Sequence, residues 1–223
     1  MRISEVTIDV RDCRKAAEFY GSTMGLPVAR TPGAATVTVG RTTLILRENA
    51  DAQGCHHLAF TIPSNKFAAS KHWVSQRTEV MSLRGEDEFE YAAGWNARSL
   101  YFPGPEGTVL EFIIRRDLDN AAAGAFRPHD LECISEVGVA VPDVLSTVEV
   151  LSTRAGIEPY RLTPRDRFSP VGTIDGLIIL VTPDRPWFPA ETLLSGQSRI
   201  LIEATDARRG SYPLGEYSTL TVS

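Results

Sequence analysis

The sequence predicts an α+β protein built from repeated β-α-β-β-β modules, with one complete two-module lobe followed by a degenerate second lobe. Three observations lead to this prediction: an internal repeat, short amphipathic helices that follow it, and short strand-like runs separated by Gly and Pro. The 223-residue chain, of which 43% is hydrophobic, is long enough for one large domain or two small ones.

The internal repeat marks the first strand of two modules. Residues 3–12 read ISEVTIDVRD, and residues 134–143 read ISEVGVAVPD. Both begin Ile-Ser-Glu-Val, share two further β-branched positions and close on Asp. Both also alternate in the way that strand residues do. Each segment therefore predicts a strand that leads into a helix.

A short helix is expected after each copy of the repeat. Asp12 is a candidate N-cap, and the segment 13–25 then places apolar residues at helical spacing and closes with Gly. Asp143 and the segment 144–156 repeat this arrangement, again with a closing Gly. The two modules match in order and in length.

The remaining strands follow from short β-prone runs between turn residues. The first module should continue with strands at 27–30, 35–39 and 42–47. A second module should begin at Cys55, with a helix at about 64–77 and strands near 79–84, 97–102 and 108–115. A third should span 133–183 and end with a strand at 177–182.

The fourth module is expected to be incomplete. Segments 199–205 and 217–222 look like strands, but no helix is expected between them, and residues 207–216 look turn-like. The boundary between lobes should fall near 118–131, where the chain becomes small, polar and interrupted by Pro. We therefore predict a complete lobe at 1–118 with a candidate metal site, and a degenerate lobe at 131–223 with no ligand set.

Composition narrows the choice of partners and compartment. The formal net charge is −5 and no run of Lys or Arg occurs, so neither nucleic acid nor an anionic membrane is an expected partner. A small-molecule substrate or ligand is expected instead. Three cysteines without C-x-x-C spacing indicate neither a disulfide framework nor a thiolate zinc site. With no signal-like or membrane-spanning apolar stretch visible, we expect a cytoplasmic protein.

Three stretches resemble the glyoxalase/bleomycin-resistance/dioxygenase, or vicinal oxygen chelate, superfamily. They are AEFY at 17–20 with GLP at 25–27, HHLAFTIP at 56–63, and YFPGPEGTVLEFI at 101–113. The resemblance implies that two modules pair to form a cup around a metal ion. Its ligands would come from the first strand of each module and the last strand of the second.

By that resemblance the metal ligands are Glu5, His57 and Glu111. The superfamily most often has His at the first of these positions, so Glu5 is a departure, and a further carboxylate found in some members would fall near Ile45. The residues themselves support a cation, because Glu111 interrupts an apolar run where an unpaired buried carboxylate would be costly.

One imidazole and two carboxylates suit a divalent metal ion such as Fe, Mn, Zn or Mg. Such an ion acts as a Lewis acid on adjacent substrate oxygens. We therefore expect a glyoxalase-like enzyme that acts on a small molecule with vicinal oxygens, of lyase, isomerase or dioxygenase type. Because Glu5 breaks the 2-His-1-carboxylate pattern of iron oxygenases, lyase, isomerase or hydrolase-like chemistry is favoured over dioxygenase chemistry.

Other interpretations of the same residues stay open from the sequence. Glu5 could be a strand-face carboxylate that pairs with Arg, because Glu136 stands at the same position of the second copy with no His or Glu partners aligned to it. His57 could be a core histidine. Glu111 could pair with Arg98 or Arg115. The pair Trp187-Phe188 could cap the cup or plug a subunit contact.

The chain as a whole also has alternatives to an enzyme. One is a metal-free protein that binds or sequesters a small molecule, of the bleomycin-resistance type. Another is a structural or regulatory homodimer with the degenerate lobe as its interface.

Overall fold

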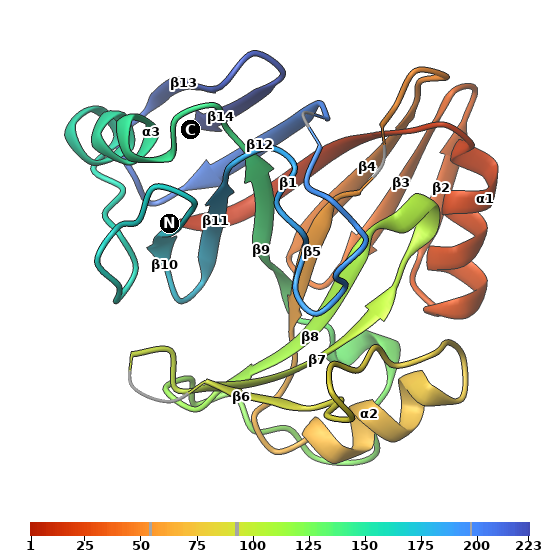
Figure 1. Cartoon of the computed structure of the whole chain (residues 1–223). Helices are drawn as coiled ribbons and strands as arrows, with labels where there is room; N and C mark the ends of the chain where they lie inside the picture. The colour runs from red at the N-terminus through yellow and green to blue at the C-terminus, as the bar shows by residue number, and fades with distance from the viewer. Residues whose placement is uncertain (54, 92–93, 197) are drawn as a thin grey trace.

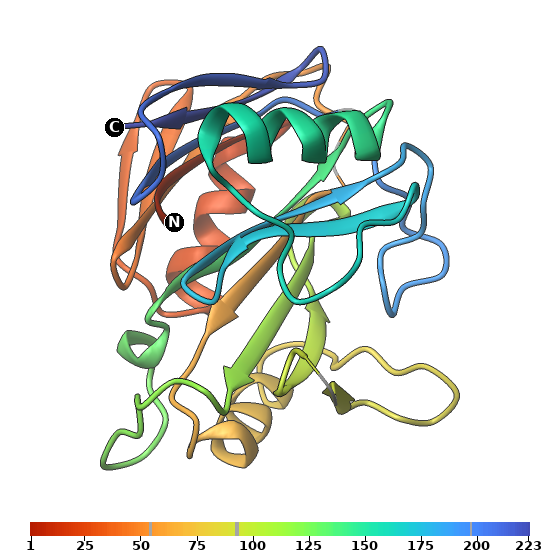
Figure 2. The same ribbon diagram turned by 90° about the vertical axis from the view of Figure 1, so that its left-hand side faces the viewer.

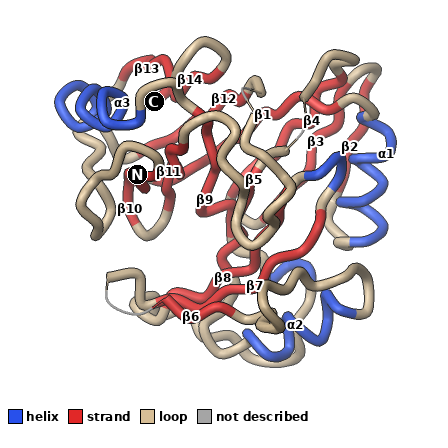
Figure 3. The backbone as a smooth tube through the Cα atoms, in the orientation of Figure 1, coloured by secondary structure: helices blue, strands red, loops and turns tan. Residues whose placement is uncertain are grey.

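Two sheets make up most of the protein. The computed structural model describes residues 1–53, 55–91, 94–196 and 198–223 (Figures 1 and 3), and within these ranges the strands form two seven-stranded sheets. Sheet A has the order β13 (Gly210–Leu214), β14 (Ser218–Val222), β12 (Ile200–Thr205), β1 (Arg2–Val10), β4 (Thr42–Glu48), β3 (Ala34–Val39), β2 (Val28–Thr31). Sheet B has the order β10 (Phe168–Thr173), β11 (Gly176–Val181), β9 (Cys133–Ala140), β5 (His57–Thr61), β8 (Val109–Arg115), β7 (Ala97–Pro103), β6 (Phe89–Tyr91).

Each sheet joins two modules through their first strands. In sheet A, β1 of the first module runs antiparallel to β12 of the fourth. In sheet B, β5 of the second module runs antiparallel to β9 of the third. Each of the predicted lobes, 1–118 and 131–223, therefore contributes one module to each sheet. The predicted lobes group modules that are neighbours along the chain. In the structure, strand pairing joins the first module to the fourth and the second to the third.

The two helices that follow the repeat begin where the sequence predicts, whereas the third begins a few residues later than predicted. α1 (Cys13–Glu18) is capped by Asp12, whose side chain accepts a hydrogen bond from the Lys15 amide, and a π-helical turn (Phe19–Thr23) extends it. α3 (Val144–Val150) is capped in the same way by Asp143, and the following turn (Leu151–Ala155) ends at a left-handed Gly156. α2 (Phe67–Ser75) is shorter than predicted.

Helices α1 and α3 lie between the two sheets, and α2 lies against β7 and β8 (Figure 2). The main hydrophobic core fills this layer, with side chains from both sheets such as Val6, Leu44, Leu58 and Phe112. The opposite face of each sheet points away from this core. None of the helices in the described ranges is long and apolar enough to cross a membrane.

Two local predictions were wrong. Residues 79–84 form no strand, because Arg84 and Gly85 both have positive φ and make a tight turn that closes a single bridge between Leu83 and Glu86. Residues 207–216 contain β13 instead of only turns. Pro213 gave that segment its turn-like appearance, but β13 is an edge strand, where a missing amide hydrogen is tolerated.

Candidate metal centre

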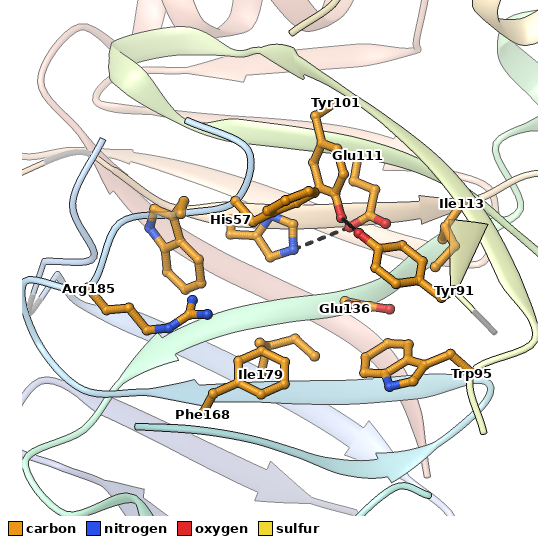
Figure 4. Close-up of a pocket in the computed structure, with 12 residues that line it drawn as sticks. His57, Tyr91, Trp95, Tyr101, Glu111, Ile113, Glu136, Phe168, Ile179 and Arg185 are labelled. Carbon is orange, nitrogen blue, oxygen red and sulfur yellow. Dashed lines mark hydrogen bonds and ion pairs between the residues drawn. The ribbon is translucent and has the colours of Figure 1, made fainter. Parts of the chain in front are cut away.

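Three buried side chains converge on the outer face of sheet B. His57 of β5, Glu111 of β8 and Glu136 of β9 each offer a ligand atom, and these atoms all lie within 4.8 Å of one another (Figure 4). All three side chains are less than a tenth exposed. They form a cluster that could hold a metal ion.

Strand register explains why these three residues meet. Ala59 of β5 is paired with Glu111 on one side and with Glu136 on the other. His57 lies two residues before Ala59, and residues two apart in a strand point to the same face. Three adjacent strands therefore present one imidazole and two carboxylates to a single point.

His57 is held in the form that binds metal. Its Nδ1 lies 3.2 Å from the Val109 carbonyl oxygen, so we assign the proton to Nδ1, which leaves the Nε2 lone pair free. Nε2 lies 3.5 Å from Glu111 Oε2. Burial lowers the pKa of His57 to about 4, so the imidazole is neutral at physiological pH.

Glu111 is a buried carboxyl group with no arginine or lysine bound to it within the described residues. Burial, followed by the nearby Glu136 carboxylate, raises the pKa of Glu111 well above its usual value. Without a cation at this point Glu111 therefore favours its protonated form. A divalent ion would supply the missing charge and displace that proton.

Glu136 already has a cationic partner. Arg115, which is fully buried, donates from Nη2 to Glu136 Oε1 in an ion pair. The Arg115 guanidinium also lies 5.8 Å from the Trp95 ring and 5.9 Å from the Tyr160 ring. Burial nevertheless raises the pKa of Glu136. Arg115 fixes one oxygen of Glu136, and a ligand atom of this carboxylate still lies within the cluster.

The donor set fits a divalent metal ion of the kind that the fold implies. A neutral imidazole whose other nitrogen donates to a carbonyl oxygen is the usual form of a histidine ligand. Two carboxylates and one imidazole suit Fe, Mn, Zn or Mg, and three protein ligands leave positions open for a substrate.

The structure brings together two of the three residues predicted from sequence. His57 and Glu111 are adjacent, but Glu5 lies on β1 in sheet A, paired in register with Glu203. Its place in the cluster is taken by Glu136, the corresponding Glu of the second Ile-Ser-Glu-Val copy. The repeat could have pointed to Glu136 as a ligand. Because the second lobe was expected to carry no ligands, Glu136 was not included in the predicted site.

Several alternatives left open by the sequence are also resolved. The Arg98 side chain pairs with Glu88 and Glu90 and not with Glu111. His56 points to the opposite side from His57, with Nε2 3.3 Å from the Asp9 carbonyl oxygen.

A cavity of about 290 Å³ lies directly over the cluster. Its wall is mainly aromatic and apolar, with one arginine in addition to the cluster residues. Trp187 and Phe188 both belong to this wall. The Trp187 ring stacks on His57 at 5.3 Å, and its indole N–H donates to the Cys55 carbonyl oxygen at 2.7 Å. The full lining comprises His57, Tyr91, Trp95, Tyr101, Glu111, Ile113, Glu136, Phe168, Ile179, Arg185, Trp187 and Phe188.

Solved structures share this fold across the whole chain. A provisionally named dioxygenase from Bacillus subtilis superposes with a TM-score of 0.62 at 15% identity, covering 100% of this chain and 85% of its own. Glyoxalase I from Zea mays superposes with a TM-score of 0.56 at 12% identity, covering 99% of this chain and 91% of its own.

No protein-family model matches the sequence, and no curated protein does. The fold and the buried His/Glu/Glu cluster define the class: this is an α+β protein of repeated βαβββ modules with a cup on one sheet. The chain has the fold of the glyoxalase/bleomycin-resistance/dioxygenase, or vicinal oxygen chelate, superfamily.

Proposed function

We propose that the protein is a metal-dependent, glyoxalase-like enzyme that acts on a small molecule with two neighbouring oxygens. His57, Glu111 and Glu136 would hold the metal ion. The observation that carries this proposal is the buried His/Glu/Glu cluster at the base of an aromatic cavity. A divalent ion held there supplies a Lewis acid for the two oxygens.

The cavity walls supply the other requirements for such a reaction. Tyr91 and Tyr101 line the cavity with their hydroxyl oxygens 2.7 Å apart. Burial raises the pKa of both groups, so they stay protonated and are placed to donate to a substrate oxygen. Trp187 covers His57 and limits the access of water. Lyase or isomerase chemistry fits a site of this kind, in which one imidazole and two carboxylates depart from the iron-oxygenase pattern.

A second candidate is a metal-free protein that binds and sequesters an aromatic or apolar ligand. The observation that favours it is the Arg115–Glu136 ion pair, which already balances one of the two carboxylates. A protonated Glu111 would then leave the cavity without uncompensated charge at the cluster. Metal dependence separates the two candidates.

The test is elemental analysis of untagged protein after equal metal reconstitution, comparing wild type with His57→Ala, Glu111→Gln and Glu136→Gln. Glu5→Gln is the matched control, because Glu5 occupies the same repeat position in the other sheet. We expect near-stoichiometric metal in wild type and in Glu5→Gln. Removing a ligand should cost more than the roughly 10–100-fold affinity that loss of an outer-shell partner costs.

Equal metal content in wild type and the three cluster variants would overturn the metal proposal. Loss of metal from Glu5→Gln as well would point to a general effect on folding. Far-UV circular dichroism of each variant distinguishes that outcome. Metal-free wild type that binds aromatic ligands would support the second candidate.

A further inference from the structure

Arg185 stands out among the cavity residues because it has no acidic partner in the part of the chain that the structure describes. It belongs to the segment that follows β11, and its guanidinium points into the cavity on the side of His57 (Figure 4). Its Nη1 donates to the Pro186 carbonyl oxygen at 3.4 Å, and its guanidinium carbon lies 5.1 Å from the Phe168 ring. Across the described ranges, no carboxylate lies within ion-pair distance of it.

The surroundings of Arg185 are unfavourable for a lone cation. Its side chain is partly buried, and burial together with the nearby Arg167 lowers the pKa of Arg185. Arg115, which is buried beside the cluster and does not line the cavity, is by contrast neutralised by Glu136. A guanidinium that is half desolvated and close to a second cation gains most from an anion brought in by a ligand.

The balance of charge in the cavity favours the same kind of ligand. Glu111 and Glu136, when ionised, balance Arg185 of the cavity wall and Arg115, which pairs with Glu136 from outside it. A divalent ion at the cluster then leaves the cavity with a net positive charge. A ligand with a negative group besides its two neighbouring oxygens would offset that charge.

We propose that Arg185 binds a carboxylate of the substrate, so that the substrate class is an acid with an apolar body and two neighbouring oxygens. His57 lies between Arg185 and Glu111 in Figure 4, so the two ends of the ligand are held on opposite sides of the imidazole. A single planar guanidinium matches a planar carboxylate through two parallel hydrogen bonds. This inference rests on the proposed function for the position of the oxygen pair.

The test uses ligands that carry both groups. The monohydroxamic acids of glutaric, adipic and suberic acid place two chelating oxygens at one end and a carboxylate at the other, and their methyl esters lack only the charge. Binding to zinc-reconstituted protein is measured by calorimetry for wild type, Arg185→Met, Arg185→Lys and Arg167→Met. Arg167 is the matched control because it is a nearby cation that does not line the cavity.

In wild type, at least one acid should bind roughly tenfold or more tightly than its ester. A difference of this size is the affinity that a hydrogen bond to a charged group usually contributes. Arg185→Met should remove this preference and leave ester binding unchanged. Arg185→Lys should restore part of it, and Arg167→Met should keep it. Equal binding of acid and ester to wild type would overturn the proposal, as would an undiminished preference in Arg185→Met.

Failure of the metal proposal would look different, because neither acid nor ester would bind in a zinc-dependent manner. The carboxylate inference is then decided in metal-free protein with 3-phenylpropanoate and 3-phenylpropanamide. Quenching of tryptophan fluorescence reports binding, since Trp95 and Trp187 line the cavity. A preference for the acid that Arg185→Met abolishes supports the role of Arg185; no preference overturns it.

Discussion

Sheets A and B place the same repeat position in different surroundings. Glu5 of β1 and Glu136 of β9 occupy the same place in the Ile-Ser-Glu-Val repeat. Glu136 pairs across the module boundary with Ala59, whereas Glu5 pairs with Glu203 of β12. Following the register from these pairs, Leu201 and Thr221 of sheet A take the positions of His57 and Glu111.

The two faces also differ in what covers them. In sheet B, the Trp187 segment closes over the cluster, and His57, Glu111 and Glu136 are buried. On sheet A, Glu203 and Thr221 are exposed. The repeat therefore places a carboxylate at the same position in both sheets. Whether that carboxylate joins a metal cluster depends on the residues of the paired module and on the segment that covers that face of the sheet.

The largest difference between the two sheets should appear in the free energy of unfolding when one arginine charge is removed from each. Arg115→Met leaves Glu136 buried without its partner, which should destabilise the protein by roughly 3–5 kcal/mol. The exposed pair Arg2–Asp206 on sheet A is the control, and Arg2→Met should cost less than about 1 kcal/mol. Urea unfolding of both variants measures the contrast. Similar costs for the two would show that Glu136 is not held by Arg115 as an ion pair.

A second experiment tests whether sheet A differs from sheet B in metal binding only because it lacks two of the three ligands. Leu201→His with Thr221→Glu, made in a Glu111→Gln background, would complete a His/Glu/Glu set around Glu5. We expect new metal binding, weaker than that of the original cluster by roughly 10–100-fold because this face of sheet A is exposed at positions 203 and 221. Cobalt titration with visible absorption detects it. The same variant with Glu5→Gln added should bind no cobalt at this position, and binding that persists there would refute the register argument.

The smallest effect concerns the pH dependence of sheet A. Partial burial, followed by the Glu203 carboxylate, raises the pKa of Glu5 above its ordinary value of 4.5. A carboxyl group whose pKa is higher in the folded state stabilises the protein below its ordinary pKa, and this contribution is lost as the pH rises through the raised pKa. Glu5→Gln should therefore stabilise the protein at pH 7, by less than about 1 kcal/mol given solvent screening.

At pH 4, where Glu5 is mostly protonated in both states, the same substitution should have little effect. Thermal unfolding of wild type and Glu5→Gln at the two pH values measures the difference. Glu203→Gln should act in the same direction, because it removes the charge that Glu5 faces. A destabilisation of equal size at both pH values would instead show that the Glu5 side chain makes a favourable contact.

Much of the fold followed from local sequence patterns. Alternation, the repeat and the capping residues Asp12 and Asp143 predicted most strands and the starts of α1 and α3 correctly. His57 and Glu111 were brought together as predicted, because β5 and β8 belong to one module. Glu136 was missed because its partnership depends on which modules pair, and short-range patterns carry no information about that. Arg185 was missed for a similar reason, since only the folded chain brings it to the cavity.

The pairing of the first module with the fourth has a consequence for how the chain folds. During synthesis, β5 can gain its partner as soon as β9 has emerged, so sheet B can close early. β1 must wait for β12, and the contact between Arg2 and Thr205 spans most of the chain. Such distant contacts slow folding, and an unpaired edge strand is open to pairing with other chains. Until residues 200–205 have been made and paired, β1 is therefore an edge strand of the N-terminal module.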